Sequence, residues 1–202
     1  VEEGVTQTGQ EVTAIVAENF LKYDTSVGVM CKQNHAEIFP VDMGMVTDTK
    51  VRTDHKIAYG TQNMTKGPAM TREQAVKGIE AGIAMVEELK EKGYRILATG
   101  EMGIGNTTTS SAVASVLLKQ SVESMTGRGA GLTSEGLVRK IAAIRKAIEV
   151  NQPDPEDAVD VLAKVGGLDI AGMTGVFLGG AVYHIPVVMD GFISCVAALI
   201  AM

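Results

Sequence analysis

The sequence lacks any cluster of lysine or arginine, and this absence limits the partners that it predicts. The 202 residues include 18 basic and 24 acidic side chains, for a formal net charge of −6 at pH 7. Binding to a nucleic acid requires concentrated positive charge against the phosphate backbone. We therefore expect no nucleic-acid partner, while a discrete phosphate site built from backbone N–H groups and one lysine remains open.

Metal-type spacing is also lacking among the few cysteines and histidines. Cys31 and Cys195 lie far apart in the sequence, and His35, His55 and His184 are isolated from one another. We expect two buried free thiols in a reducing compartment, no metal and no cofactor. Because no signal peptide opens the chain, a cytoplasmic location is predicted.

One long apolar run is present, in residues 170–189 (IAGMTGVFLGGAVYHIPVVM), and it is almost long enough to cross a bilayer. His184 and Pro186 lie within it, and Gly179 and Gly180 break its composition. We therefore expect a buried helix followed by a buried strand, and no membrane partner.

Both ends of the chain suggest that the sequence is part of something larger. The last run, GFISCVAALIAM, ends with nothing polar after it, whereas a soluble domain normally covers such a face. The first residue is Val1, and the opening residues begin as if within an element. We expect residues 1–202 to form a single α/β core domain from the middle of a longer enzyme, without its N- and C-terminal helical parts. The alternative is a structural subunit whose ends are covered by a partner.

Helical and strand-like segments alternate along the chain. Continuous apolar runs, typical of buried strands, cover residues 36–42, 94–100 and 185–191, and a short strand is expected near residues 55–60. This alternation predicts an α/β fold with a parallel sheet and helices on both of its faces. Helical patterns cover residues 9–23, 25–33, 71–93, 110–120, 133–150, 156–167, 168–182 and 191–202, and Thr71 and Gln74 form a capping-box pattern.

Three of the expected strands end at an acidic residue, namely Asp42, Glu101 and Asp190. Ligands of parallel α/β sheets bind beyond the carboxyl ends of the strands. These three carboxylates are therefore candidates for one shared crevice.

A glycine- and hydroxyl-rich loop, GEMGIGNTTTSS at residues 100–111, follows one of these strands and opens a helix. Gly103 and Gly105 let backbone N–H groups approach an anion, and Asn106 and Thr107 can cap the helix or bond phosphate oxygens. The spacing is not that of the dinucleotide fingerprint, and no Lys-Ser/Thr pair closes a P-loop. A turn that merely connects strand to helix stays open as an alternative.

Glu101 is at odds with a loop that holds only phosphate. Two like unit charges 4 Å apart repel by roughly 4 kcal/mol at an effective dielectric of 20. We expect Glu101 to face a sugar hydroxyl or a ring nitrogen, so that the ligand carries a sugar and a base besides its phosphate. The alternative is a solvated loop acid.

A second glycine-rich turn, at residues 127–131, opens another helix, and Lys140 lies about two turns into it. A lysine there can close over a phosphate as a point charge. A surface lysine is the alternative.

The sequence resembles the nicotinate-nucleotide–dimethylbenzimidazole phosphoribosyltransferases, enzymes of lower-ligand assembly in cobalamin synthesis. The resemblance extends over nearly the whole chain, with its motifs in the family's order. The motifs are EGVTQTGQEVT, PVDMGM, GTQNMTKGPAMTREQA, GEMGIGNTT, GRGAGL with the following RK, NQPDPEDAVDVLAKVGG, DIAGMTGVFLGGA and PVVMDGFIS.

The resemblance implies a transferase that moves the phosphoribosyl group of nicotinate mononucleotide to 5,6-dimethylbenzimidazole. A ring nitrogen of the base attacks C1′ with inversion, nicotinate leaves, and α-ribazole 5′-phosphate forms. It also implies a homodimer of chains with a Rossmann-like α/β domain and a small helical domain, which is largely missing from this chain.

The resemblance assigns roles to particular residues. Glu101 corresponds to a carboxylate beside the ribose and the attacking base. The base pocket would include Thr8, Met102 and Ile104. The phosphoribosyl group would be held by Gly103, Ile104, Gly105, Asn106, Thr107, Gly129 and Lys140.

Two motifs of the family are absent from the sequence. One is an N-terminal PPGSLG, and the other is a C-terminal RLGEGSG that carries the glutamate acting as general base. A general base contributes about 10²–10⁴-fold in rate, so this chain alone is expected to be impaired unless Glu101 substitutes in part. The alternative function is a non-catalytic module that binds α-ribazole phosphate or a related nucleotide.

Overall fold

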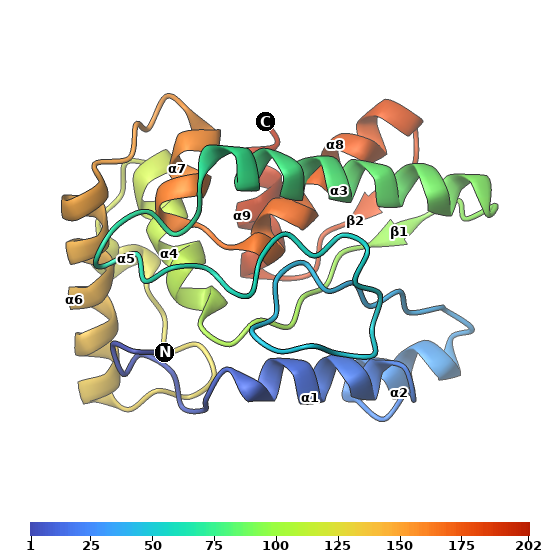
Figure 1. The fold of residues 1–202 in the computed structure, drawn as a ribbon, viewed down its shortest axis with the longest axis horizontal. Coiled ribbons are helices and arrows are strands. Elements are labelled where there is room, and N and C mark those ends of the chain that lie inside the picture. Colours follow the sequence, from blue (N-terminus) through green and yellow to red (C-terminus); the bar gives the residue numbers. More distant parts are fainter.

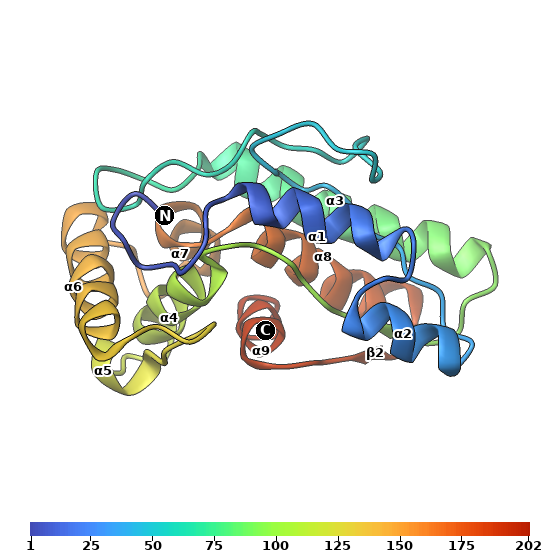
Figure 2. The ribbon, with the colours of Figure 1, turned by 90° about the horizontal axis from the view of Figure 1, so that it is seen from below.

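Helices make up most of the structure, a computed structural model that describes residues 1–202, and they surround one short sheet (Figure 1). The helix α3 runs beside α8, while α1 and α2 lie on the opposite side of the molecule (Figures 1 and 2). The helices are α1 (Glu11–Phe20), α2 (Ser26–Gln33), α3 (Arg72–Glu91), α4 (Asn106–Leu117), α5 (Val122–Met125), α6 (Ser134–Asn151), α7 (Ala158–Val165), α8 (Leu168–Tyr183) and α9 (Phe192–Ile200).

The sheet consists of two parallel strands, β1 (Leu97–Ala98) and β2 (Val187–Val188), in which Leu97 pairs with Val187. The predicted α/β class with a parallel sheet is confirmed, although each strand is shorter than its apolar run. Parallel pairing directs the carboxyl ends of both strands to the same edge. The residues that follow the strands, Glu101 and Asp190, are thereby brought to one side of the sheet.

The strands expected at residues 36–42 and 55–60 do not form. The only pairing in this region is an isolated parallel bridge between Val41 and Arg52. Pro40 lacks the N–H that a ladder requires. The Asp42 carboxylate accepts the backbone N–H groups of Gly44 and Met45 at 2.9 and 2.7 Å, which turns the chain where a strand would continue.

The predicted helices are present, including the capping box, in which Thr71 and Gln74 bond each other's backbone N–H groups. The apolar run at residues 170–189 forms α8 and then β2, and α8 ends where His184 adopts a positive φ of 56°. None of the helices has the length and apolar character needed to cross a membrane. Both cysteines are free as predicted, but Cys195 is exposed and Cys31 is half-buried, so the expectation of buried thiols was wrong.

The crossing of α3 and α8 is built on glycines that bring the two backbones into contact. A Cβ added at Gly82 would lie 2.0 Å from the carbonyl oxygen of Gly172, and one at Gly175 would lie 2.0 Å from that of Ile79. The first turn of α8 is therefore held in a fixed position against α3. This turn carries Leu168 and Asp169 into the site described below.

The substitution Gly82→Ala should lower the free energy of unfolding by about 2 kcal/mol, because the added methyl group forces the two helices apart. The loss is expected even though alanine is favoured over glycine in a helix by about 1 kcal/mol. Urea denaturation of this variant and of Gly67→Ala measures the effect. The control fits because a Cβ at Gly67 meets no atom within 4 Å. Equal urea midpoints for Gly82→Ala and Gly67→Ala would show that α3 and α8 can move apart without loss of stability.

Candidate active site

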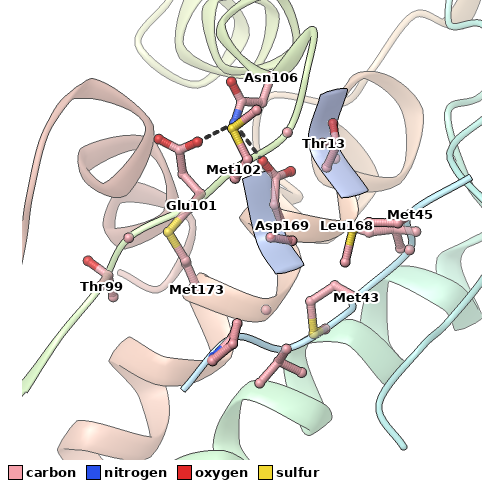
Figure 3. Close-up of a pocket in the computed structure, with 18 of the residues that line it drawn as sticks. Thr13, Met43, Met45, Thr99, Glu101, Met102, Asn106, Leu168, Asp169 and Met173 are labelled. Carbon is pink, nitrogen blue, oxygen red and sulfur yellow. Dashed lines mark hydrogen bonds between the residues drawn. The ribbon is translucent and has the colours of Figure 1, made fainter. Parts of the chain in front are cut away.

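A cleft of about 1330 Å³ opens beside the loop between β1 and α4. Its lining comes from segments far apart in the sequence: the loop itself, the start of α8, α1 and the irregular segment near residue 43 (Figure 3). Apolar side chains, acidic side chains and an amide all contribute to this lining. The labelled lining residues are Thr13, Met43, Met45, Thr99, Glu101, Met102, Asn106, Leu168, Asp169 and Met173.

One amide in the lining joins two carboxylates. The Nδ2 atom of Asn106, the first residue of α4, donates to Glu101 Oε2 at 2.5 Å and to Asp169 Oδ2 at 2.9 Å (Figure 3). Glu101 comes from the loop and Asp169 from the first turn of α8. Asp190, after β2, also lines the cleft, and its charge acts on Glu101.

The environment raises the pKa values of Glu101 and Asp169. Burial raises the pKa of Glu101, the hydrogen bond from Asn106 partly opposes that rise, and the charges of Asp169 and Asp190 add to it. Burial also raises the pKa of Asp169, again against the hydrogen bond from Asn106. Carboxylates with raised pKa values accept a proton more readily at neutral pH than exposed ones do.

The start of α4 presents backbone donors that are not used within the protein. Gly105 has a positive φ of 99° and precedes the helix. The N–H of Ile104 donates to Thr13 Oγ1 at 3.1 Å, whereas those of Gly103, Gly105 and Thr107 have no acceptor. Free N–H groups at a helix N-terminus, together with the helix dipole, are typical of an anion site.

Lys140 is directed at the same helix start and is only 1% exposed. Its Nζ donates to Thr107 Oγ1 at 2.8 Å and to the carbonyl oxygen of Gly127 at 3.1 Å, and no carboxylate pairs with it. Burial lowers the pKa of this ammonium group to about 8. Lys140 is therefore not a surface lysine.

Gly129 lies beside Thr107 and Lys140 and has a positive φ of 58°. A Cβ at this position would lie 2.6 Å from Thr107 Oγ1 and 3.4 Å from Lys140 Nζ. Only glycine leaves this space open. Thr107, Gly129 and Lys140 thus meet at one point, which adjoins the cleft through Gly105 and Asn106.

The structure does not bring Asp42 and Thr8 to the cleft. Asp42 is fully buried, its Oδ1 holds the turn at Gly44 and Met45, and its Oδ2 lies 3.0 Å from Lys56 Nζ. Because no strand ends there, it does not join the other two acids, but its turn places neighbouring methionines in the cleft wall. Thr8 is exposed and outside the lining.

The remaining predicted base-pocket residues, Met102 and Ile104, do line the cleft. Sequence reasoning missed Asp169, Thr13 and Met43. The one signal for Asp169 was an acid in the second position of an otherwise apolar helix that follows two glycines. Within the structure, no group of three or more His, Cys, Asp or Glu side chains is arranged to hold a metal ion.

The fold and this site together define an α/β protein with a cleft at the carboxyl edge of a parallel sheet, beside the N-terminus of a helix. A family model described as Phosphoribosyltransferase matches residues 1–202. The chain therefore belongs to this phosphoribosyltransferase family.

Two named relatives agree with this assignment. The chain is 55% identical to the nicotinate-nucleotide–dimethylbenzimidazole phosphoribosyltransferase of Ruminiclostridium cellulolyticum and 51% identical to that of Acetivibrio thermocellus. In each case 100% of this chain and 58% of the relative are aligned. The chain thus spans little more than half the length of these curated relatives.

A solved structure supports the same relationship. The crystal structure of CobT from Thermus thermophilus superimposes with a TM-score of 0.93 at 35% sequence identity. The superposition covers 100% of this chain and 61% of that one. The similarity therefore extends over the entire fold described above.

Proposed function

We propose that this chain transfers the phosphoribosyl group of nicotinate mononucleotide to 5,6-dimethylbenzimidazole, releasing nicotinate and forming α-ribazole 5′-phosphate. The observation that carries the proposal is the buried ammonium of Lys140, which has no anionic partner and lies beside free N–H groups at the start of α4. The names of the relatives supply the particular substrates.

An uncompensated buried charge is costly, and the protein itself supplies nothing to neutralise Lys140. A phosphate monoester would pair with the ammonium group and accept from the N–H groups of Gly105 and Thr107. Gly129, lacking a side chain, leaves room for its oxygens. In this assignment the phosphate binds at Thr107, and the attached ribose extends past Asn106 toward Glu101.

The apolar side chains of the lining suit the bases that take part in the proposed reaction. Met43, Met102, Met173 and Leu168 line the same cleft as Glu101, and methionine side chains pack well against planar rings. A ring nitrogen of the benzimidazole would attack C1′ there, while the bond from C1′ to the nicotinate nitrogen breaks. The second ring nitrogen of the benzimidazole loses its proton, and the Glu101 carboxylate is the nearest group we assign to accept it.

Incubation with both substrates tests the proposal. Nicotinate release, followed by liquid chromatography, should require nicotinate mononucleotide and dimethylbenzimidazole together. Omission of either substrate is the control. Binding of α-ribazole phosphate without nicotinate release above background would overturn the catalytic proposal and leave a nucleotide-binding module. The homodimer and the cytoplasmic location predicted from the sequence stay predictions.

A further inference from the structure

We propose that Asp169 is a positioning residue, which fixes the Asn106 amide so that this amide orients the Glu101 carboxylate in the cleft. The inference rests on the proposed function, in which Glu101 faces the ribose and the attacking base. Asp169 itself is not assigned a contact with either substrate.

The Asn106 amide donates to Glu101 and to Asp169 at the same time. A side-chain amide has two N–H donors on one nitrogen, and in Asn106 that nitrogen contacts Glu101 Oε2 on one side and Asp169 Oδ2 on the other. Rotating the amide by half a turn would place its carbonyl oxygen against both carboxylates. Asp169 therefore selects the orientation in which the amide donates to Glu101.

Asp169 itself is held in a fixed position. Its carboxylate lies between two glycines: a Cβ at Gly103 would be 3.0 Å from Oδ2, and one at Gly167 would be 2.6 Å from Oδ1. The residue belongs to the first turn of α8, which the glycine crossing with α3 holds in place. A helix N-terminus also favours a negative charge there.

Glu101 has no comparable support of its own. It lies on the loop between β1 and α4, and its only hydrogen-bond partner is Asn106. A loop carboxylate is thus connected to two helices, α4 and α8, through a single amide. The charged groups that act on Glu101 are Asp169 from α8 and Asp190 from the segment after β2. No cation pairs with it.

The kinetic test compares Asp169→Ala, Asp169→Asn and the double variant Asp169→Ala/Glu101→Gln. We expect Asp169→Ala to lower kcat by about 10²-fold, the scale of a 1 Å misplacement, with KM for nicotinate mononucleotide changed less than about threefold. Asparagine retains an oxygen that accepts from Asn106, so Asp169→Asn should recover part of kcat. In the Glu101→Gln background, Asp169→Ala should lower kcat little further, because the effects of substitutions at residues that act through each other are not additive.

The control for loss of an acid from a first helical turn is Asp160→Ala. Asp160 lies in the first turn of α7, outside the cleft lining, and pairs with Lys164. This variant should keep the kcat of the wild type. If Asp169→Ala lowered kcat by the same factor in the wild-type and the Glu101→Gln backgrounds, the positioning role would be overturned.

A second measurement does not depend on turnover. The side-chain amide signals of Asn106 in ¹⁵N NMR spectra, assigned by their loss in Asn106→Ala, should show slow hydrogen exchange in the wild type because both N–H groups are bonded. Asp169→Ala should speed that exchange, and Asp160→Ala should not. Unchanged exchange in Asp169→Ala would overturn the inference even if nicotinate release is observed. Absent nicotinate release would overturn the proposed function alone.

Discussion

Replacing Glu101 by glutamine should lower kcat by about 10²–10⁴-fold, the usual contribution of a positioned acid or base. Glutamine has nearly the same shape, and its amide oxygen still accepts the hydrogen bond from Asn106. In the proposed assignment the phosphate end of the ligand binds elsewhere, at Thr107 and Lys140. KM for nicotinate mononucleotide should therefore change little, so steady-state kinetics of nicotinate release separate the two effects.

Stability measurements distinguish this loss from unfolding. A group whose pKa is raised on folding stabilises the protein only in its protonated form, and that contribution disappears as the pH rises through the folded pKa. The pKa of Glu101 is raised by burial, so its ionised form is unfavourable in the folded state at neutral pH. We expect Glu101→Gln to be at least as stable as the wild type at pH 7, and less active.

The same pKa shift predicts a pH profile. Below the folded pKa of Glu101 the carboxyl group is protonated and cannot accept a proton, so kcat should fall at acidic pH, starting above the ordinary glutamate value. Glu135→Gln, at an exposed position of α6, is the matched control and should retain activity. A Glu101→Gln variant with the turnover of the wild type would show that this acid takes no part in the chemistry.

Local sequence signals predicted the helices and pointed to the residues that meet at the start of α4, namely Thr107, Gly129 and Lys140. The capping box at Thr71, the glycines before α4 and the lysine in α6 each depend on residues close in sequence. Such patterns specify a helix start or a left-handed backbone position wherever they occur. The loop at residues 100–111, several residues of which line the cleft, was therefore recognisable as a candidate site from the sequence alone.

Contacts between residues far apart in the sequence could not be predicted from local patterns. Asp42 follows an apolar run that looks like a strand, yet its carboxylate accepts hydrogen bonds from the backbone that follows it and forms an ion pair with Lys56. Asp169 has no local motif, because its role arises from the crossing of α8 with α3 and from the distant Asn106. The β1–β2 pairing joins residues about ninety positions apart, and apolar runs do not reveal how far such pairing extends.

Removing the ammonium group of Lys140 should weaken binding of nicotinate mononucleotide by roughly 30-fold to several-thousandfold. That range corresponds to the about 2–5 kcal/mol lost when one partner of a buried, hydrogen-bonded charge pair is truncated. Lys140→Ala and Lys140→Met both remove the charge, but methionine fills most of the space. Calorimetric titration of the two variants separates the loss of charge from the effect of a cavity. Lys146→Ala, at an exposed position of the same helix, is the control.

The dependence of this affinity on pH follows from the same group. Burial lowers the pKa of Lys140 to about 8, so above that pH the empty site loses its charge and must take up a proton to bind a phosphate. A phosphate monoester has a second pKa of about 6, so it is already a dianion above pH 8. Titration of the ligand therefore adds nothing to the change of affinity with pH in this range. Affinity of the wild type should fall as the pH rises from 8 to 9.5, and Lys140→Met should show no such fall. A wild-type affinity that is constant over this range would place the phosphate away from Lys140, and with it the ribose away from Glu101.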